Sequence, residues 1–152
     1  MGKKDSFINL VNKLRPGVAM LQETKLYRQG QIKIDNYCVF ENLRGQSEGG
    51  GLLTMVHENF EPVLVPRKKT SKMDENILVV EAKLGISRIR YLNAYGSISN
   101  KIEFFSILDQ EIDNAFSSNC FMCLQMDANG KLGNEIIAGD PYEISPTVRI
   151  NQ

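Results

Sequence analysis

The most informative stretch of this chain is Val18-Ala19-Met20-Leu21-Gln22-Glu23-Thr24-Lys25, in which a short apolar run passes directly into polar residues. A run of this length is typical of a strand, and we interpret residues 18–21 as a buried parallel strand. The carboxylate of Glu23 is then expected at the C-terminal end of that strand. Ligand sites in α/β sheets gather outside these ends, so Glu23 is a candidate site residue.

A second carboxylate has the same setting further along the chain. Residues 121–126 also read as a buried strand, which leads into Asp127, and Asn129 follows two residues later. Glu23 and Asp127 can therefore converge in the folded chain. Two oxygen donors with phosphate and water are the usual environment of Mg²⁺. Taken alone, a strand-end Glu or an Asp-x-Asn tripeptide is usually a cap or a turn.

Helices and strands alternate along the rest of the chain. A first helix, capped by Asp5 or Ser6 and ended by Pro16-Gly17, has an apolar stripe at Phe7, Leu10, Val11 and Leu14. A second helix, opened by Ser99 or Asn100, has the stripe Ile102, Phe105, Leu108, Ile112 and Phe116. Further strands are expected at residues 37–41, 52–56, 77–84 and 88–94, the last two joined as a hairpin by Gly85-Ile86-Ser87. Without an internal repeat or boundary, residues 1–152 are interpreted as one α/β domain.

Composition argues against several classes of function. With 42% hydrophobic residues and a formal net charge of zero, the chain fits a globular domain without a global basic field. The basic group Arg67, Lys68, Lys69 and Lys72 is more simply a solvated loop than a phosphate contact. No window approaches the roughly 18–20 apolar residues that span a bilayer, which argues against membrane function. Thiols without a signal peptide indicate a reducing, intracellular setting, in the nucleus or the cytoplasm.

Three further features have simple structural interpretations. Gly49-Gly50-Gly51 is not followed by Gly-Lys-Ser/Thr, so it is no P-loop and more simply allows a bend before the next strand. Cys120-x-x-Cys123 has a metal-ligand spacing, but residues three apart on a strand point to opposite faces, which favours buried structural cysteines. His57 ends a strand and is interpreted as an ordinary surface histidine.

The order of four motifs resembles the endonuclease/exonuclease/phosphatase superfamily. The motifs are L-Q-E-T-K at 21–25, G-G-G-L-L at 49–53, R-I-R-Y-L-N-A-Y-G at 88–96 and D-A-N-G-K-L-G at 127–133. The resemblance covers residues 7–141, and residues 127–133 are similar to the endonuclease domains of non-LTR retrotransposons in the exonuclease III-like branch. It implies a DNase I-like α/β sandwich, in which two mixed β-sheets pack against each other between flanking helices.

The resemblance also implies roles for individual residues. Glu23 would ligate Mg²⁺, with Mn²⁺ as an alternative ion, and Tyr95 would contact the scissile phosphate. Asp127 and Asn129 would be the D-x-N pair that positions and activates the attacking water. The metal would polarise the phosphoryl oxygen of a DNA substrate and neutralise developing charge. From the residues alone, Tyr95 reads as an aromatic filling the face of a sheet.

Some parts of the superfamily pattern are missing. No strand bearing the catalytic Asn precedes the first helix, and neither the further active-site Asp nor the closing Ser-Asp-His follows, since no histidine comes after His57. Met126 replaces the glycine that commonly precedes the D-x-N pair. We therefore expect a domain truncated at both ends, with an incomplete second half and weak or absent activity in isolation. Its partly exposed inner face would favour self-association.

Three functions remain open at this stage. The first is an Mg²⁺-dependent phosphodiesterase, either the DNA endonuclease of a retroelement, with a reverse transcriptase domain in a longer parent chain, or a relative of apurinic-site nucleases. The second is a non-catalytic remnant or interaction domain, which the absent histidine and the zero net charge favour. The third is a phosphatase of the same superfamily acting on an inositol phosphate or a lipid head group.

Overall fold

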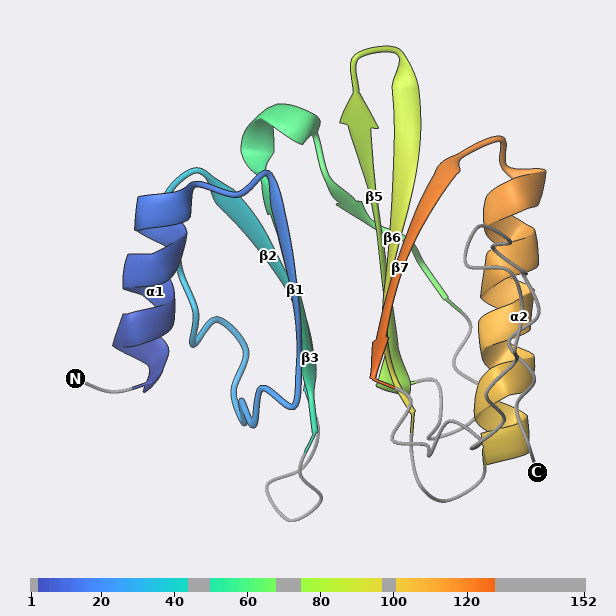
Figure 1. Ribbon diagram of the computed structural model, residues 1–152, viewed down its shortest axis with the longest axis horizontal. Helices are drawn as coiled ribbons and strands as arrows, with labels where there is room; N and C mark the ends of the chain where they lie inside the picture. Colours follow the sequence, from blue (N-terminus) through green and yellow to red (C-terminus); the bar gives the residue numbers. More distant parts are fainter. Residues whose placement is uncertain (1–2, 44–49, 68–74, 97–100, 128–152) are drawn as a thin grey trace, which may run out of the picture.

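The computed structural model describes residues 3–43, 50–67, 75–96 and 101–127, which form four stacked layers (Figure 1). Two sheets pack face to face in the middle, with one helix on each outer side. α1 (Lys3–Leu14) covers the first sheet, and α2 (Lys101–Ser117) covers the second. The predicted sandwich of two sheets between helices is therefore confirmed.

The first sheet is antiparallel throughout its described part. Its strands lie in the order β1-β3-β2 and are β1 (Val18–Gln22), β2 (Tyr37–Asn42) and β3 (Leu52–His57). The 3-10 helix η1 (Glu58–Phe60) follows β3 and leads toward the second sheet. The strands predicted at residues 37–41 and 52–56 are thus present, and each is one residue longer at its C-terminal end.

The second sheet is mixed. Its described strands lie in the order β4-β5-β6-β7 and are β4 (Val63–Leu64), β5 (Ile77–Leu84), β6 (Ser87–Tyr95) and β7 (Phe121–Asp127). Only β6 and β7 run parallel, because α2 carries the chain back between them. The predicted hairpin joins β5 to β6, and the pairing of Leu84 with Ser87 leaves Gly85-Ile86 as a two-residue turn.

The central strands β3 and β5 are buried on both faces. On β5, Leu78 and Val80 pack against the first sheet, whereas Ile77 and Val79 pack with Phe104 of α2. A strand that is buried on both sides requires an uninterrupted apolar run rather than an alternating one. In β5 this run is residues 77–80, and the strand continues to Leu84 with Glu81 and Lys83 alternating with apolar residues, within the predicted bounds 77–84.

β1 and β7 are edge strands on the same side of the molecule, the side that faces the viewer in Figure 1. The prediction of a buried parallel strand at residues 18–21 is wrong, because β1 is half-buried and pairs antiparallel with β3. The strand predicted at 121–126 is present but mostly exposed, and Phe121 keeps 68% of its surface accessible. An edge strand has a neighbour on one side only, whatever its hydrophobicity.

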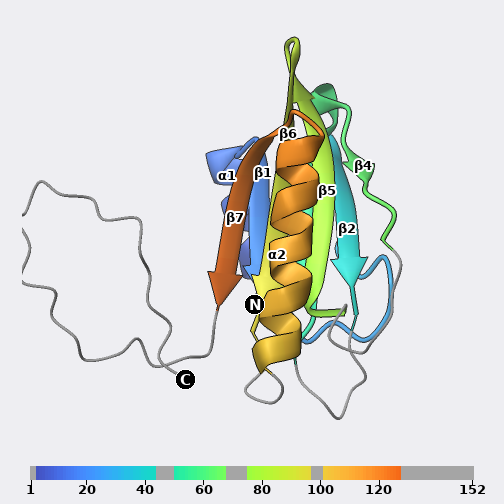
Figure 2. The same ribbon diagram turned by 90° about the vertical axis from the view of Figure 1, so that its right-hand side faces the viewer.

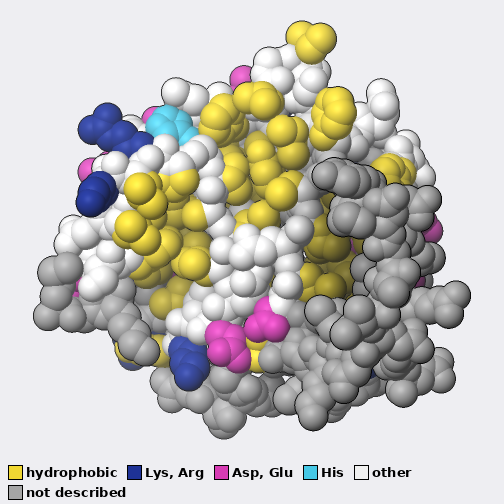
Figure 3. Space-filling model, viewed as in Figure 1, with side chains coloured by type: hydrophobic (Ala, Val, Ile, Leu, Met, Phe, Trp, Pro, Cys, Tyr) yellow, Lys and Arg dark blue, Asp and Glu magenta, His cyan; other side chains and the backbone are white. Residues whose placement is uncertain are grey.

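Apolar side chains on this side are therefore accessible to solvent. Figure 2 shows β7 at the margin of the second sheet. Figure 3, viewed as Figure 1, shows hydrophobic atoms spread over the face on which β7 lies. Leu124 and Met126 of β7 are each 37% exposed, in addition to Phe121. These exposed side chains belong to the edge strand β7, and Leu124 and Met126 share the strand face of Met122, which packs toward α2. The expected partial exposure of the inner face between the sheets stays a prediction.

Both helices pack through part of the expected apolar stripe, and the other stripe residues remain exposed. α1 begins at Lys3, so Asp5 lies in its first turn rather than capping it, and its charge there favours the helix dipole. Leu10 of α1 and Phe116 of α2 are exposed, whereas the predicted contacts through Val11 and Leu108 are buried. The way each helix docks on its sheet decides which of its apolar residues are buried, and the other apolar residues remain in water.

No helix in the described part of the chain is long and apolar enough to cross a bilayer.

Arg67 is not part of a solvated basic loop. Its Nε lies 2.6 Å from Glu111 Oε1 of α2, and its guanidinium donates to the carbonyl oxygen of Ile77 at 2.9 Å. Lys68, Lys69 and Lys72 lie outside the described residues. The solvated-loop interpretation is therefore wrong for Arg67, because a helix distant in sequence supplies a partner for its charge.

A second, partly buried charge cluster surrounds Glu81 on β5. Arg90 Nη2 and Arg88 Nη1 lie 3.0 and 3.2 Å from its carboxylate oxygens, and Cys120 Sγ donates to it at 3.5 Å. Desolvation acts to raise the pKa of Glu81, but the hydrogen bonds from Arg90 and Cys120 and the charges of Arg88 and Arg90 outweigh it and lower that pKa. The charged form of Glu81 therefore stabilises the fold.

We predict that Glu81→Gln lowers the free energy of unfolding at pH 7 by about 1–3 kcal/mol. Because the folded pKa is depressed, the contribution of Glu81 is complete above its unfolded pKa of about 4.3 and is lost as the pH falls through the folded value. Urea unfolding from pH 7 down to pH 3 should therefore show the wild type and the variant converging in acid.

The control for this prediction is Glu61→Gln, which removes an exposed ion pair with Lys83. Such pairs contribute little, so its effect should stay below about 1 kcal/mol at every pH. A constant difference between wild type and Glu81→Gln across the whole range would contradict the assigned pKa direction.

Candidate active site

Glu23 lies immediately after β1 in a turn with unusual backbone geometry. Glu23 and Lys25 have positive φ angles of 52° and 54°, a region that residues with a side chain rarely adopt. Thr24 N donates to Gly51 O at 3.2 Å, and Lys25 N donates to Gly50 O at 2.9 Å. Strained backbone of this kind persists only where the surroundings hold it, and it is frequent at functional sites.

The glycines before β3 form the support for this turn. Gly50 and Gly51 have φ angles of 86° and 91°, so the predicted bend is present at these two positions, while Gly49 lies outside the described residues. A Cβ on Gly51 would lie 2.8 Å from Thr24 Oγ1 and 3.6 Å from Asn42 O. The absence of a side chain at Gly51 therefore lets the two segments approach closely.

Tyr95 reaches across from the second sheet to Glu23. It is the last residue of β6, and its hydroxyl donates a hydrogen bond to Glu23 Oε1. Its ring packs in the apolar cluster between the two sheets. The sheet-aromatic interpretation thus describes the ring, and the hydroxyl adds a polar contact between residues that are 72 positions apart.

Asp127 lies beside Tyr95 at the end of β7. The parallel register pairs Tyr95 with Asp127, and Gly96 N donates to Asp127 O at 2.7 Å. Acidic side chains gather at the lower end of the open face in Figure 3, where β1 and β7 end. Tyr95 is thus the common neighbour of Glu23 and Asp127. Asn129 lies outside the described residues.

His57 lies at the opposite end of the first sheet from Glu23. The register pairs Gln22 with Leu52 and Val18 with Val56, so β3 carries His57 away from the Glu23 turn. Its Nδ1 accepts a hydrogen bond from Asn59 N at 3.3 Å, and its ring meets Tyr37 edge to face at 5.1 Å. His57 therefore lies apart from the candidate site, which agrees with its interpretation as an ordinary histidine without a role in that site.

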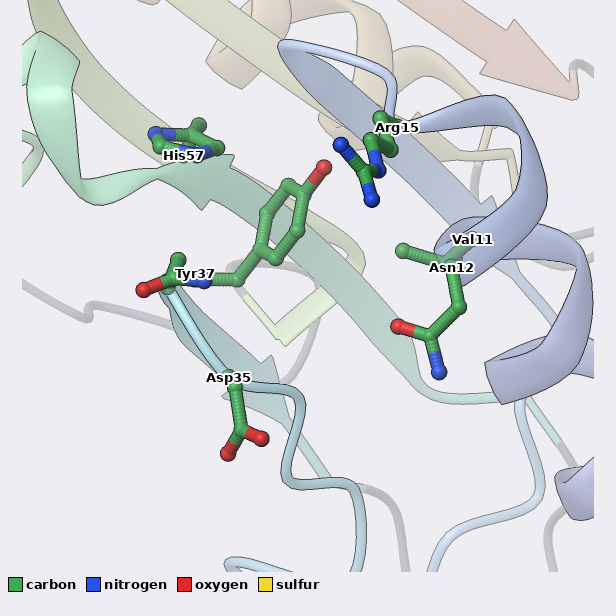
Figure 4. A pocket seen from close by; sticks show the side chains of 7 residues that line it. Val11, Asn12, Arg15, Asp35, Tyr37 and His57 are labelled. Atoms are coloured by element: carbon green, nitrogen blue, oxygen red, sulfur yellow. The ribbon is translucent and has the colours of Figure 1, made fainter.

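A half-open hollow of about 400 Å³ lies at this opposite end (Figure 4). Its lining comes from α1, from the segment before β2 and from the end of β3, and includes Arg15, Asp35, Tyr37 and His57. Tyr37 stands between His57 and Arg15 in the figure, and its hydroxyl donates to Pro16 O at 2.7 Å. The hollow contains none of the predicted site residues.

The carboxylates at the strand ends fit a hard, mostly hydrated cation. Among the described residues there is no group of three or more His, Cys, Asp or Glu side chains that could enclose a metal. Glu23 and Asp127 are exposed, which leaves room for water and phosphate. Mg²⁺ usually takes one or two carboxylates and keeps several waters, so this donor set fits it and does not fit a zinc cage.

The two cysteines of the Cys120-x-x-Cys123 motif differ in their surroundings. Cys120 is buried and donates to Glu81, as expected for a structural cysteine. Cys123 is exposed, so its predicted burial is wrong, because it lies on the edge strand β7. The third cysteine, Cys38, is also exposed on β2.

Sequence reasoning missed three carboxamide side chains next to the site, those of Gln22, Asn93 and Gln125. Asn93 is completely buried and lies two residues before Tyr95 on β6. Gln125 lies two residues before Asp127 on β7, and Gln22 directly precedes Glu23. Side chains two residues apart on a strand lie on the same face, so the spacing of Asn93 from Tyr95 and of Gln125 from Asp127 was a signal in the sequence that could have identified them.

Comparisons with known proteins identify the fold. No family model matches the chain, and no curated protein matches it. The endonuclease domain of TRAS1, a telomere-specific non-LTR retrotransposon, matches at a TM-score of 0.61 and 18% identity, over 84% of this chain and 53% of that one. Truncated Caenorhabditis elegans TDP2 matches at a TM-score of 0.61 and 14% identity, over 84% of this chain and 55% of that one. An AP endonuclease from Archaeoglobus fulgidus matches at a TM-score of 0.57 and 20% identity, over 87% of this chain and 54% of that one.

This chain has the DNase I-like fold. The resemblance that the sequence motifs indicated is confirmed at this level by the retrotransposon and repair-nuclease structures. The chain spans about half the length of the structures that it matches. Because the identities are low, the likeness concerns the DNase I-like fold, and the chemistry has to be argued from this chain's own residues.

We predict that Gly51→Ala destabilises the protein by about 2–5 kcal/mol. Positive φ accounts for roughly 1–2 kcal/mol of this effect, and the close contact with Thr24 adds about 1–3 kcal/mol. Gly85→Ala is the matched control, since Gly85 has a φ of 63° and a Cβ there would meet nothing within 4 Å. Urea unfolding should show a loss of only about 1–2 kcal/mol for Gly85→Ala. Equal losses in the two variants would contradict the close approach of the Glu23 turn to Gly51.

Proposed function

We propose that this chain carries metal-binding and phosphate-contacting residues of an Mg²⁺-dependent phosphodiesterase that acts on DNA. The observation that supports this function best is the hydrogen bond from Tyr95 to Glu23, with Asp127 paired beside Tyr95. Three polar groups from three strands, distant in sequence, thereby lie at one end of the sandwich. Such a convergence at strand ends is typical of a site rather than of separate caps and turns.

Each residue has a role that suits its position. The exposed carboxylate of Glu23 would hold Mg²⁺, or Mn²⁺ in its place, and the bound ion would supply charge neutralisation at the phosphate. The Tyr95 hydroxyl, whose partly buried ring packs between the sheets, would contact the scissile phosphate. Asp127, together with Asn129, would orient the attacking water. Lys25 is exposed next to Glu23 and adds a local positive charge to a chain without net charge.

DNA is the substrate class that the similar structures suggest. One is an endonuclease domain of a retrotransposon, another is an AP endonuclease, and D. rerio TDP2 was solved with a single-strand DNA product. We propose the endonuclease of a retroelement, with a reverse transcriptase in a longer parent chain, or a relative of apurinic-site nucleases. Either role would place the protein with DNA in the nucleus or the cytoplasm.

Turnover is expected to be slow in this chain. His57 lies at the far end of the first sheet, so the described residues place no histidine beside Glu23 or Asp127. A missing general base lowers the rate by about 10²–10⁴-fold. The metal and phosphate contacts would remain, because they do not depend on that base.

An interaction role is the second candidate, and the open side of the sandwich favours it. β1 and β7 each have one strand neighbour among the described residues, and β7 exposes Phe121, Leu124 and Met126. Apolar edge strands readily pair with other chains or with copies of themselves. This role needs neither a metal nor DNA, so the following two measurements separate it from hydrolysis.

We predict that the chain binds Tb³⁺ in a saturable manner and that Mg²⁺ competes for the site. Tb³⁺ prefers oxygen ligands, and its luminescence can be excited through a nearby tyrosine, which is selective here because the chain contains no tryptophan. Glu23→Gln should weaken binding by about tenfold or more. Glu58→Gln, an exposed acid on η1, should leave the affinity unchanged. Binding that is absent, or equal in Glu23→Gln, would argue against a metal site.

We also predict slow, Mg²⁺-dependent nicking of supercoiled plasmid or abasic DNA. Glu23→Gln and Asp127→Asn should each reduce the rate by about 10²–10³-fold, because each removes a group that acts on the transition state. Glu58→Gln again serves as the control. Retention of wild-type rates in both site variants would refute the proposed roles, and complete absence of nicking by the wild type would favour the interaction role.

A further inference from the structure

A buried carboxamide joins the two sheets directly behind the candidate site. Asn93 of β6 has no accessible surface, and its Nδ2 donates to Leu53 O at 2.9 Å and to Leu21 O at 3.1 Å. Thr54 Oγ1 lies 3.3 Å from the same nitrogen. The side chain of one sheet thus binds the main chain of two paired strands in the other sheet, at the pair Leu21 and Leu53.

Two glutamines extend this contact to the open edge of the sandwich. Gln22 Nε2 donates to Asn93 Oδ1 at 2.7 Å, and Gln125 Nε2 donates to Gln22 Oε1 at 3.3 Å. Gln125 Nε2 also donates to Met20 O at 3.2 Å. The two bonds between side chains run in one direction, from Gln125 through Gln22 to Asn93, so each polarises the next. We call Gln125, Gln22 and Asn93 the amide chain.

The amide chain is connected to every described site residue by a very short piece of backbone. Asn93 and Tyr95 lie two apart on β6, and Gln125 and Asp127 lie two apart on β7, so each pair shares one face of its strand. Gln22 is the last residue of β1 and directly precedes Glu23. A displacement of the amide chain would therefore move the site residues with it.

The geometry of the site depends on a fixed offset between the two sheets. Apolar contacts between sheets are not directional and tolerate sliding, whereas a hydrogen bond weakens steeply when its geometry is lost. Tyr95 and Glu23 come from different sheets, so their hydrogen bond requires a particular offset. β1 also has a strand neighbour on one side only among the described residues, and Asn93 and Gln125 hold the carbonyls of Leu21 and Met20 near its end.

We propose that Asn93, Gln22 and Gln125 are positioning residues that set the offset between the sheets and thereby hold Tyr95 against Glu23. They act through the strands and do not touch the substrate. As a statement about metal and phosphate binding, this inference rests on the proposed function. As a statement about the contact between Tyr95 and Glu23, it stands on the hydrogen bonds described above.

The test compares Asn93→Ala with Asn42→Ala in the full chain. Asn42 is a second carboxamide between the sheets, and its Nδ2 donates to Glu75 O at 3.1 Å and to Ile77 O at 3.3 Å. Both variants lose hydrogen bonds between the sheets, but only Asn93 is connected to Gln22 and Gln125. Gln22→Met provides a third variant that keeps side-chain size at a half-buried position, and we expect it to disturb folding less than Asn93→Ala.

The first readout is the NMR signal of Tyr95 in protein with isotope-labelled tyrosine, assigned with Tyr95→Phe and measured without metal. Glu23→Ala, which removes the acceptor, defines the shift produced by losing the contact between the Tyr95 hydroxyl and the Glu23 carboxylate. Asn93→Ala and Gln22→Met should move the signal at least half of that way, and Asn42→Ala should leave it in place. A Tyr95 signal unchanged in both amide-chain variants would overturn the proposal.

The second readout is the Tb³⁺ affinity of the same variants. Asn93→Ala and Gln22→Met should each weaken binding by about tenfold, as expected for groups that orient a ligand, and Asn42→Ala should not. If wild-type protein binds no Tb³⁺ while the Tyr95 signal responds as expected, the proposed metal site fails and the positioning role is supported. If Tb³⁺ binds through Glu23 but neither readout responds to Asn93→Ala or Gln22→Met, the positioning role fails alone.

Discussion

The buried side chain of Asn93 joins the two sheets of this protein directly behind the candidate site. Its amide binds carbonyl oxygens of both β1 and β3, so it connects the second sheet to the edge and to the centre of the first. Apolar packing supplies the attraction between the sheets but little directional preference. The offset that brings Tyr95 to Glu23 therefore depends on polar groups that are buried and hydrogen-bonded.

Two properties of the site follow from its place at the edge of the sandwich. Glu23 and Asp127 lie at the ends of edge strands and are exposed, so a polymer such as DNA can reach them without a closed pocket. The same edges leave apolar residues of β7 accessible, which gives this side a second potential use in association. A chain without net charge must rely on local contacts at this edge for any binding to phosphate.

The sequence predicted the central parts of the fold better than its margins. The bounds of β5 were predicted correctly because its first half, which is buried on both faces, is a continuous apolar run and its second half alternates apolar with charged residues up to the turn at Gly85. The strand at residues 121–126 has a similar signature but lies at the sheet edge, and this accounts for the wrong prediction of its burial. Arg67 was misjudged for a related reason, since its partner Glu111 lies 44 residues away on α2.

The candidate site residues could be proposed from the chain alone, because the carboxylates that follow short strands and the motifs around them are properties of neighbouring residues. Sequence thus determined the kind of fold and proposed Glu23, Tyr95 and Asp127 as partners. Only the tertiary structure decided that Tyr95 contacts Glu23, that Asn93 joins the sheets and that β7 is exposed. These features depend on which strands become neighbours in space, and such pairings are set by the packing of the whole domain rather than by any local pattern.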